Sequence, residues 1–82
     1  MNEFQICDDK YLYDKIVGEH ATIISVFHAD SMRLVGSMFD DAGALSVWDA
    51  PDNYRHNLDN VATMPDDTDH CRVAWIIGYC RG

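Results

Sequence analysis

The chain of 82 residues has few cysteines, few prolines and few basic residues. Its three cysteines, Cys7, Cys71 and Cys80, are an odd number, whereas a disulfide scaffold normally has more of them and an even count. We therefore expect reduced thiols. Six Lys and Arg residues stand against 14 Asp and Glu residues, which gives a formal charge of −8. This charge opposes direct binding to nucleic acid or to anionic lipid, since both are polyanions, and it favours a positively charged partner.

Long apolar runs are also missing. No run approaches the roughly 18 residues that span a bilayer, and residues 1–4 lack the basic and apolar regions of a signal peptide. We therefore expect a cytoplasmic protein without membrane contact. The apolar share of 48% is high enough for a folded chain, and 82 residues suffice for one hydrophobic core but not for two. A single domain over residues 1–82 is expected.

Signatures of metal sites and enzymes are absent from the sequence. There is no C-x-x-C or H-x-x-x-H pair, and no G-x-S-x-G elbow, phosphate loop or dinucleotide fingerprint. If Cys71 and Cys80 end one extended strand, they lie about 30 Å apart, too far for a shared zinc ion. An EF-hand frame that starts at Asp67 places Cys71 at the third ligand position. We expect no metal, no cofactor and no enzymatic activity.

The first half of the chain predicts a short strand, a helix and a meander. Residues 2–7 alternate polar and apolar, which indicates a strand. Apolar residues at helical spacing, followed by Gly18, predict a helix over about 9–17. From Ala21 the period becomes two, and the Asp-Asp-Ala-Gly segment at 40–43 predicts a tight hairpin. Residues 21–49 should therefore form a three-stranded antiparallel meander, with a bulge near Gly36.

The second half predicts a helix and a last strand. Tyr54, Leu58 and Val61 are spaced for a short helix over about 53–62. An acidic loop follows at 65–69, and residues 72–79 read as a buried central strand because they are apolar on both faces. The predicted fold is α+β: a mainly antiparallel sheet of four to five strands, with one packed helix and a short second helix.

Aspartates gather at three of the predicted element boundaries. The clusters are Asp8-Asp9, Asp40-Asp41, and Asp66-Asp67 with Asp69. Because loops lie on the surface, we expect all three to be exposed. Clusters on one side of the sheet would imitate the spaced phosphates of nucleic acid and attract a cleft rich in arginine or lysine. The alternative is that Asp simply favours turns and helix caps, and that the charge only keeps a small protein soluble.

Two tyrosines could add short-range contacts to such an interface. Tyr11 and Tyr54 lie beside acidic residues on predicted helices, so we expect them to be exposed. Tyrosine and tryptophan are over-represented among the residues that dominate binding energy at protein interfaces.

The chain resembles the phage-encoded anti-CRISPR inhibitors in its size and in its acidity, which comes from these aspartate clusters. Many of those proteins are small acidic domains that block a nuclease complex. The resemblance lies in size and charge and transfers no functional residue. It implies an inhibitor that occupies a nucleic-acid-binding surface of a protein complex, in the host cytoplasm if the chain is phage-encoded.

The sequence thus predicts a small binding or inhibitor protein that docks on a basic protein surface through its acidic loops. The alternative is a structural or regulatory subunit that assembles as a homo-oligomer through its sheet edge.

Overall fold

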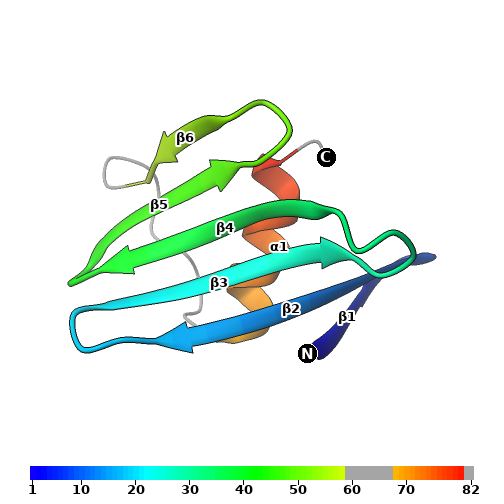
Figure 1. Ribbon diagram of the computed structural model, residues 1–82, viewed down its shortest axis with the longest axis horizontal. Helices are drawn as coiled ribbons and strands as arrows, with labels where there is room; N and C mark the ends of the chain where they lie inside the picture. The colour runs from blue at the N-terminus through cyan, green and yellow to red at the C-terminus, as the bar shows by residue number, and fades with distance from the viewer. Residues whose placement is uncertain (59–67, 81–82) are drawn as a thin grey trace.

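The computed structural model describes residues 1–58 and 68–80, which form one antiparallel sheet and one helix (Figure 1). Each strand is hydrogen-bonded to the strand that follows it along the chain. The elements are β1 (Asn2–Ile6), β2 (Asp9–Val17), β3 (Ala21–His28), β4 (Leu34–Asp41), β5 (Ala44–Asp49), β6 (Tyr54–Asn57) and α1 (Asp69–Tyr79). The expected α+β class is confirmed, but the sheet has six strands rather than four or five.

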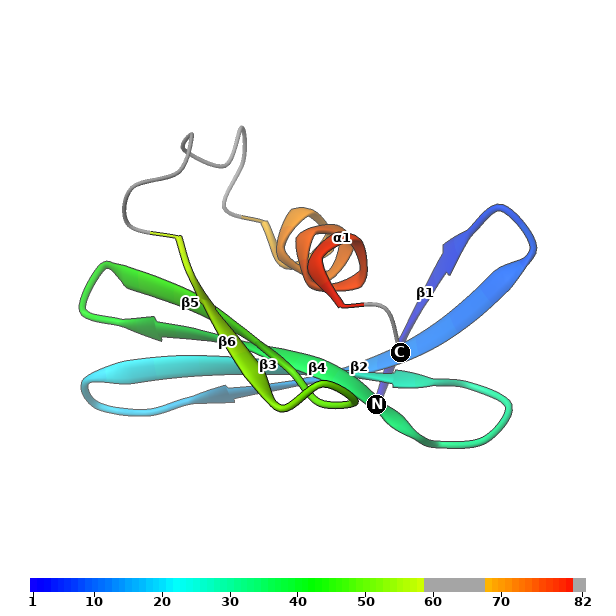
Figure 2. The same cartoon turned by 90° about the horizontal axis from the view of Figure 1, so that it is seen from above.

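The helix covers one face of the sheet, and no described element covers the other (Figure 2). We call these the helix face and the open face. On the helix face, α1 packs against β3, β4 and β5 and contributes the fully buried Val73 and Ile76. Strand residues alternate between faces, so Ile24, Val26 and Met38 point into this core. The hydrophobic core therefore lies in a single layer between helix and sheet.

The predicted meander over 21–49 is confirmed as β3, β4 and β5. Ala42 and Gly43 form its tight turn with φ angles of 51° and 94°, and the Asp40 side chain accepts a hydrogen bond from the Gly43 amide at 3.0 Å. The predicted bulge is also present, because the pairing of β3 with β4 skips Val35, the neighbour of Gly36.

The helix predicted over 9–17 is wrong, because these residues form β2. Tyr11 and Tyr13 are buried on the helix face while Leu12 and Asp14 point to the open face, which is the alternation of a strand. β2 pairs with β3 from Tyr11 to Val17 and with β1 from Asp9 to Tyr13. Backbone partners on both sides override the weak helical spacing of its apolar residues.

The strand predicted over 72–79 is also wrong, because this segment is the helix α1. Thr68 caps its N-terminus by accepting a hydrogen bond from the Cys71 amide at 3.3 Å. Val73, Ile76 and Cys80 are buried at spacings of three and four residues, so they form one face of a helix. A segment in which nearly every residue is apolar is compatible with a helix or with a strand. Here the Thr68 cap and the packing of one side of the segment on the sheet stabilise the helix.

The short second helix predicted over 53–62 is not present in the part that the structure describes. Tyr54–Asn57 form β6, which pairs with β5, and Leu58 is buried at its end. Residues 59–62 of that prediction, and most of the acidic loop predicted at 65–69, lie outside the described residues.

Candidate functional site

The turns of the sheet place the acidic residues at two opposite ends. Successive turns of a meander alternate between the ends of its strands, so the turns after β1, β3 and β5 share one end. We call it the acidic end, because four carboxylates, Asp8, Asp9, Asp30 and Asp52, are exposed there against two cations, Lys10 and Arg33. None of the four is in an ion pair with another described residue. Neighbouring turns are two strands apart, about 10 Å.

Two of these turns meet at a shallow hollow. It has a volume of about 440 Å³, and its walls include Asp8, Asp9 and Asp30 together with His28 and Lys10. Lys10 brings one positive charge against three negative ones. The hollow is therefore acidic, and the side chains that form it are contributed by β2, β3 and the turns that flank them.

Asp40, Asp41 and Asp69 are the other predicted acidic residues that the structure describes, and they lie toward the opposite end, so the described clusters do not form one face. Asp40 forms an ion pair with Arg72 of α1 at 3.0 Å, and Asp69 forms one with Lys15 of β2, also at 3.0 Å. Asp41 is exposed there without an ion pair in the described part of the chain, and Glu19 is exposed in the turn after β2, 4.0 Å from His20. Asp66 and Asp67, also predicted site residues, lie outside the described residues.

The two predicted tyrosines differ in exposure. Tyr54 is 60% exposed at the start of β6, as expected. The expectation for Tyr11 is wrong, because Tyr11 is only 9% exposed on the helix face of β2. The reason is that residues 9–17 form a strand and not a helix, and the alternation of the strand places the Tyr11 ring on the helix face. Its centre lies there 5.4 Å from the centre of the His28 ring.

A second cavity opens on the helix face at the acidic end, between β6 and the C-terminus of α1. It has a volume of about 490 Å³, and the side chains that line it are acidic or aromatic: Asp49, Asp52, Tyr54, His56 and Tyr79, beside the backbone of Gly78. Asp49 pairs with Tyr54 across β5 and β6, which brings both side chains to the same face. This arrangement depends on β6, which the sequence did not predict.

The aromatic side chains of this cavity form a continuous wall. The His56 ring lies 4.8 Å from that of Tyr54 and 5.2 Å from that of Tyr79, and Trp75 continues the row at 5.9 Å from Tyr79. Aromatic faces attract cations. The carbonyl end of α1 adds partial negative charge at the same place, and its last turn contains no basic residue.

Asp49 is the most unusual residue of the site. Its side chain is buried, with 3% of the residue exposed, and its Oδ1 atom has no hydrogen-bond partner among the described residues. Burial and, second, the charge of Asp49 raise the pKa of the Cys80 thiol to about 11, so this thiol stays protonated beside the carboxylate. A buried carboxylate oxygen without a donor is costly, by about 1–3 kcal/mol or more.

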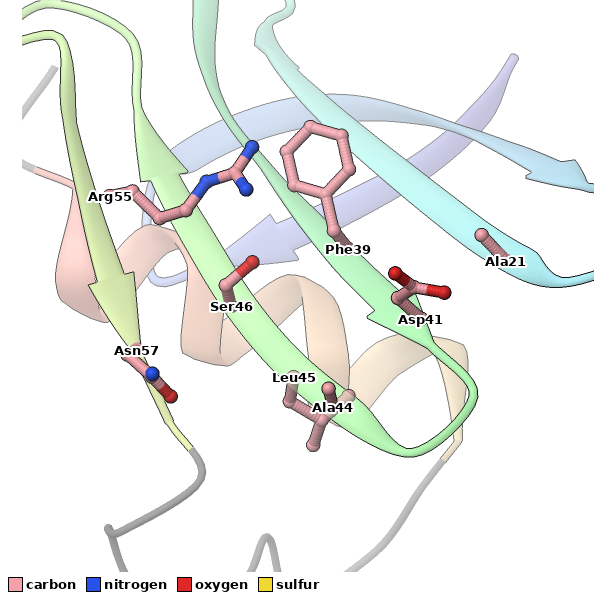
Figure 3. Close-up of a pocket in the computed structure, with 8 residues that line it drawn as sticks. All are labelled: Ala21, Phe39, Asp41, Ala44, Leu45, Ser46, Arg55 and Asn57. Atoms are coloured by element: carbon pink, nitrogen blue, oxygen red, sulfur yellow. The ribbon is translucent and has the colours of Figure 1, made fainter.

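The open face is the third notable surface (Figure 3). Figure 3 shows Arg55 of β6 reaching toward Phe39 of β4, with Ser46 of β5 between the two strands, around a hollow of about 370 Å³. The Arg55 guanidinium lies 4.8 Å from the centre of the Phe39 ring. This contact holds a cation over an aromatic ring on the open face.

Metal and membrane chemistry have no visible site in the described ranges. No three His, Cys, Asp or Glu side chains there come together in a way that could hold a metal ion. All three cysteines are free. No helix within residues 1–58 and 68–80 is both long and apolar enough to cross a membrane.

No protein-family model, no curated protein and no solved structure matches this chain. Its function must therefore be inferred from the residues of the site.

Sequence reasoning missed Asp49, His56 and Tyr79. Asp49 follows the strand of residues 44–48 at a position that reads as the start of a turn. The sequence did contain an indication of its burial. Leu45 and Val47 point to the same face of the strand and pack in the core, and Asp49 is the next residue on that face. His56 and Tyr79 could not be found, because their meeting requires β6 and the C-terminus of α1 to lie side by side.

Proposed function

We propose that this protein is a binding protein whose acidic end docks on a basic protein surface, and that the cavity beside Asp49 receives a lysine or arginine side chain of that partner. Surfaces that bind nucleic acid are rich in such side chains and are the partner class that fits. The protein would then compete with nucleic acid for the partner and act as an inhibitor.

The observation that carries this proposal is the buried Asp49 side chain, whose Oδ1 atom has no hydrogen-bond partner among the described residues. An ammonium or guanidinium group would supply both the missing hydrogen-bond donor and the opposite charge. The aromatic wall and the carbonyl end of α1 favour the same kind of ligand. Asp8, Asp9, Asp30 and Asp52 extend the negative potential along the end of the sheet, which favours encounter with a basic surface.

Binding of a nona-arginine peptide, followed by fluorescence anisotropy, tests the proposal. Asp49→Asn keeps the shape of the side chain and removes its charge. Because a hydrogen bond between charged groups contributes about 1.5–3 kcal/mol, this variant should raise Kd at least about 10-fold. It should also unfold at the same urea concentration as the parent or at a higher one, since it relieves an uncompensated buried charge.

The matched control is Asp41→Asn, which removes one carboxylate at the opposite end. It should change Kd less than about 2-fold, and the affinity of the parent should fall between 50 and 300 mM NaCl. Equal losses for Asp41→Asn and Asp49→Asn would mean that the peptide senses only the net charge, and the proposed site would be wrong.

The alternative from the sequence, assembly through the sheet edge, concerns β1 and β6, the two outer strands. They have five and four residues. Such short strands offer few backbone hydrogen bonds to another chain. The open face offers a larger surface for self-association.

A further inference from the structure

The open face of the sheet presents a regular pattern of side chains in rows that cross the strands. Residues paired across antiparallel strands lie on the same face, so the pairing of the strands defines each row. The middle row consists of Asp14, Ser25, Ser37, Trp48 and Arg55, from β2 to β6. It begins with a negative charge and ends with a positive one.

The two flanking rows are mainly apolar. One contains Leu12, Phe27 and Leu34, and the other contains Ile16, Ile23 and Phe39. Ile16 is 61% exposed, and the other five are partly buried by their neighbours in the sheet. No described element covers these rows (Figure 2). The two apolar rows lie on either side of the polar middle row, and uncovered apolar side chains with a polar surround are a feature of interaction sites.

The dimensions of the molecule limit the size of an interface on this face. The two longer ones are 32 and 24 Å, so a rectangle of about 770 Å² encloses the whole molecule in the view of Figure 1 and is an upper limit for the projected area of the open face. A standard-size protein interface buries about 800 Å² on each partner. Two sheets that pack face to face keep their strands within about 30° of each other and form an apolar layer about 10 Å thick.

We propose that the open face binds a second copy of this chain, in a dimer whose two-fold axis runs parallel to the strands between β3 and β4. This axis places β3 of one copy over β4 of the other, and β2 over β5. Ile23 then faces Phe39 of the second copy, and Phe27 faces Leu34. The apolar residues of β3 and β4 meet one another, Ser25 meets Ser37 in the middle, and Ile16 of β2 lies over Ser46 of β5 in the second copy.

Charge complementarity selects this axis. Asp14 lies over Trp48 of the second copy, and Arg55 of that copy is displaced sideways by one strand, about 4.8 Å, so that its long side chain can reach Asp14 across the gap of about 10 Å between the sheets. Symmetry forms this pair twice. A two-fold axis in the same plane but perpendicular to the strands would instead place Asp14 over Asp14 and Arg55 over Arg55. Like charges that meet across an interface disfavour that arrangement.

The dimer is independent of the proposed binding of a basic partner and is compatible with it. An axis parallel to the strands leaves the acidic ends of both copies on the same side of the dimer. The cavity beside Asp49 lies on the helix face and stays accessible in both copies.

Sedimentation equilibrium of the full chain between 1 µM and 1 mM tests the dimer. Asp14→Arg and Arg55→Asp should each raise the dimer Kd at least 10-fold, and the double variant should recover most of the loss, because the pair reforms with reversed signs. Asp52→Arg, with the same change in charge at a turn, should leave Kd within 3-fold. Ile23→Lys should give a monomer, with circular dichroism showing that each variant is folded.

Two results would overturn the proposal. One is a wild-type chain that remains monomeric at 1 mM, in which case the open face belongs to a different partner. The other is a dimer whose Kd is unchanged by Asp14→Arg, Arg55→Asp and Ile23→Lys, which would place the interface elsewhere. Recovery in the double variant cannot come from a merely structural role of either residue, because the two lie at opposite margins of the face.

Discussion

Substitution of Gly36 tests the contact between the end of α1 and the sheet. A Cβ atom at this position would lie 2.5 Å from the Trp48 carbonyl oxygen and in still closer contact with the Cys80 Sγ atom. Real Cβ atoms essentially never approach other atoms within 3.0 Å. The carbonyl belongs to β5, which pairs with β4, so it cannot withdraw without disturbing the ladder. The thiol would have to leave its 3.6 Å contact with the same carbonyl.

Gly36→Ala should therefore lower the free energy of unfolding by about 3 kcal/mol, the upper end for overpacking a core. For a domain of this size, that loss corresponds to a fall in Tm of about 12 to 24 °C. Urea unfolding at a fixed protein concentration, followed by tryptophan fluorescence, measures the change.

Gly78→Ala is the matched control. No atom lies within 4 Å of a Cβ at this position, and Gly78 is inside α1. Alanine in a helix interior is more stable than glycine by about 0.5–1 kcal/mol, so this variant should be stabilised. A Gly36→Ala variant as stable as the parent would contradict this prediction, because α1 could not then end against β4.

Two further predictions concern an ion pair and a thiol. Asp40→Asn should lower the free energy of unfolding, measured by urea titration, by about 1–2 kcal/mol, because it leaves the largely buried Arg72 without its anion. Lys15→Gln breaks the more exposed pair with Asp69 and should lower it by less than about 0.5 kcal/mol. Equal losses for the two variants would contradict this prediction. Stability should also fall as the pH rises from about 9 to 11, because the unfolded chain releases the Cys80 proton near its ordinary pKa of 9.0, whereas the folded chain holds it to about 11. Urea midpoints at pH 8.5 and 10.5 measure this fall, and Cys80→Ala should reduce it; an unchanged fall would assign it to other groups.

The charges of the candidate site were visible in the sequence, but their grouping was not. Asp8-Asp9 and Asp40-Asp41 look equivalent along the chain, since each pair lies at a predicted boundary. The order of the strands places them at opposite ends, and α1 supplies Arg72 to neutralise Asp40. An ion pair between residues 32 positions apart has no local signal in the sequence.

Local sequence features are sufficient to predict the meander over 21–49, its turn at Ala42-Gly43 and the excess of negative charge. These features depend on local alternation, on turn chemistry and on composition, which no distant contact needs to supply. Tertiary structure alone decided that residues 9–17 form a strand and residues 69–79 a helix. A short apolar segment is compatible with the spacing of a helix and with the alternation of a strand. The elements that it packs against in the folded protein decide which of the two it forms. The same packing buried Asp49 beside Tyr79 and left the other face of the sheet uncovered, because one helix can cover only one side.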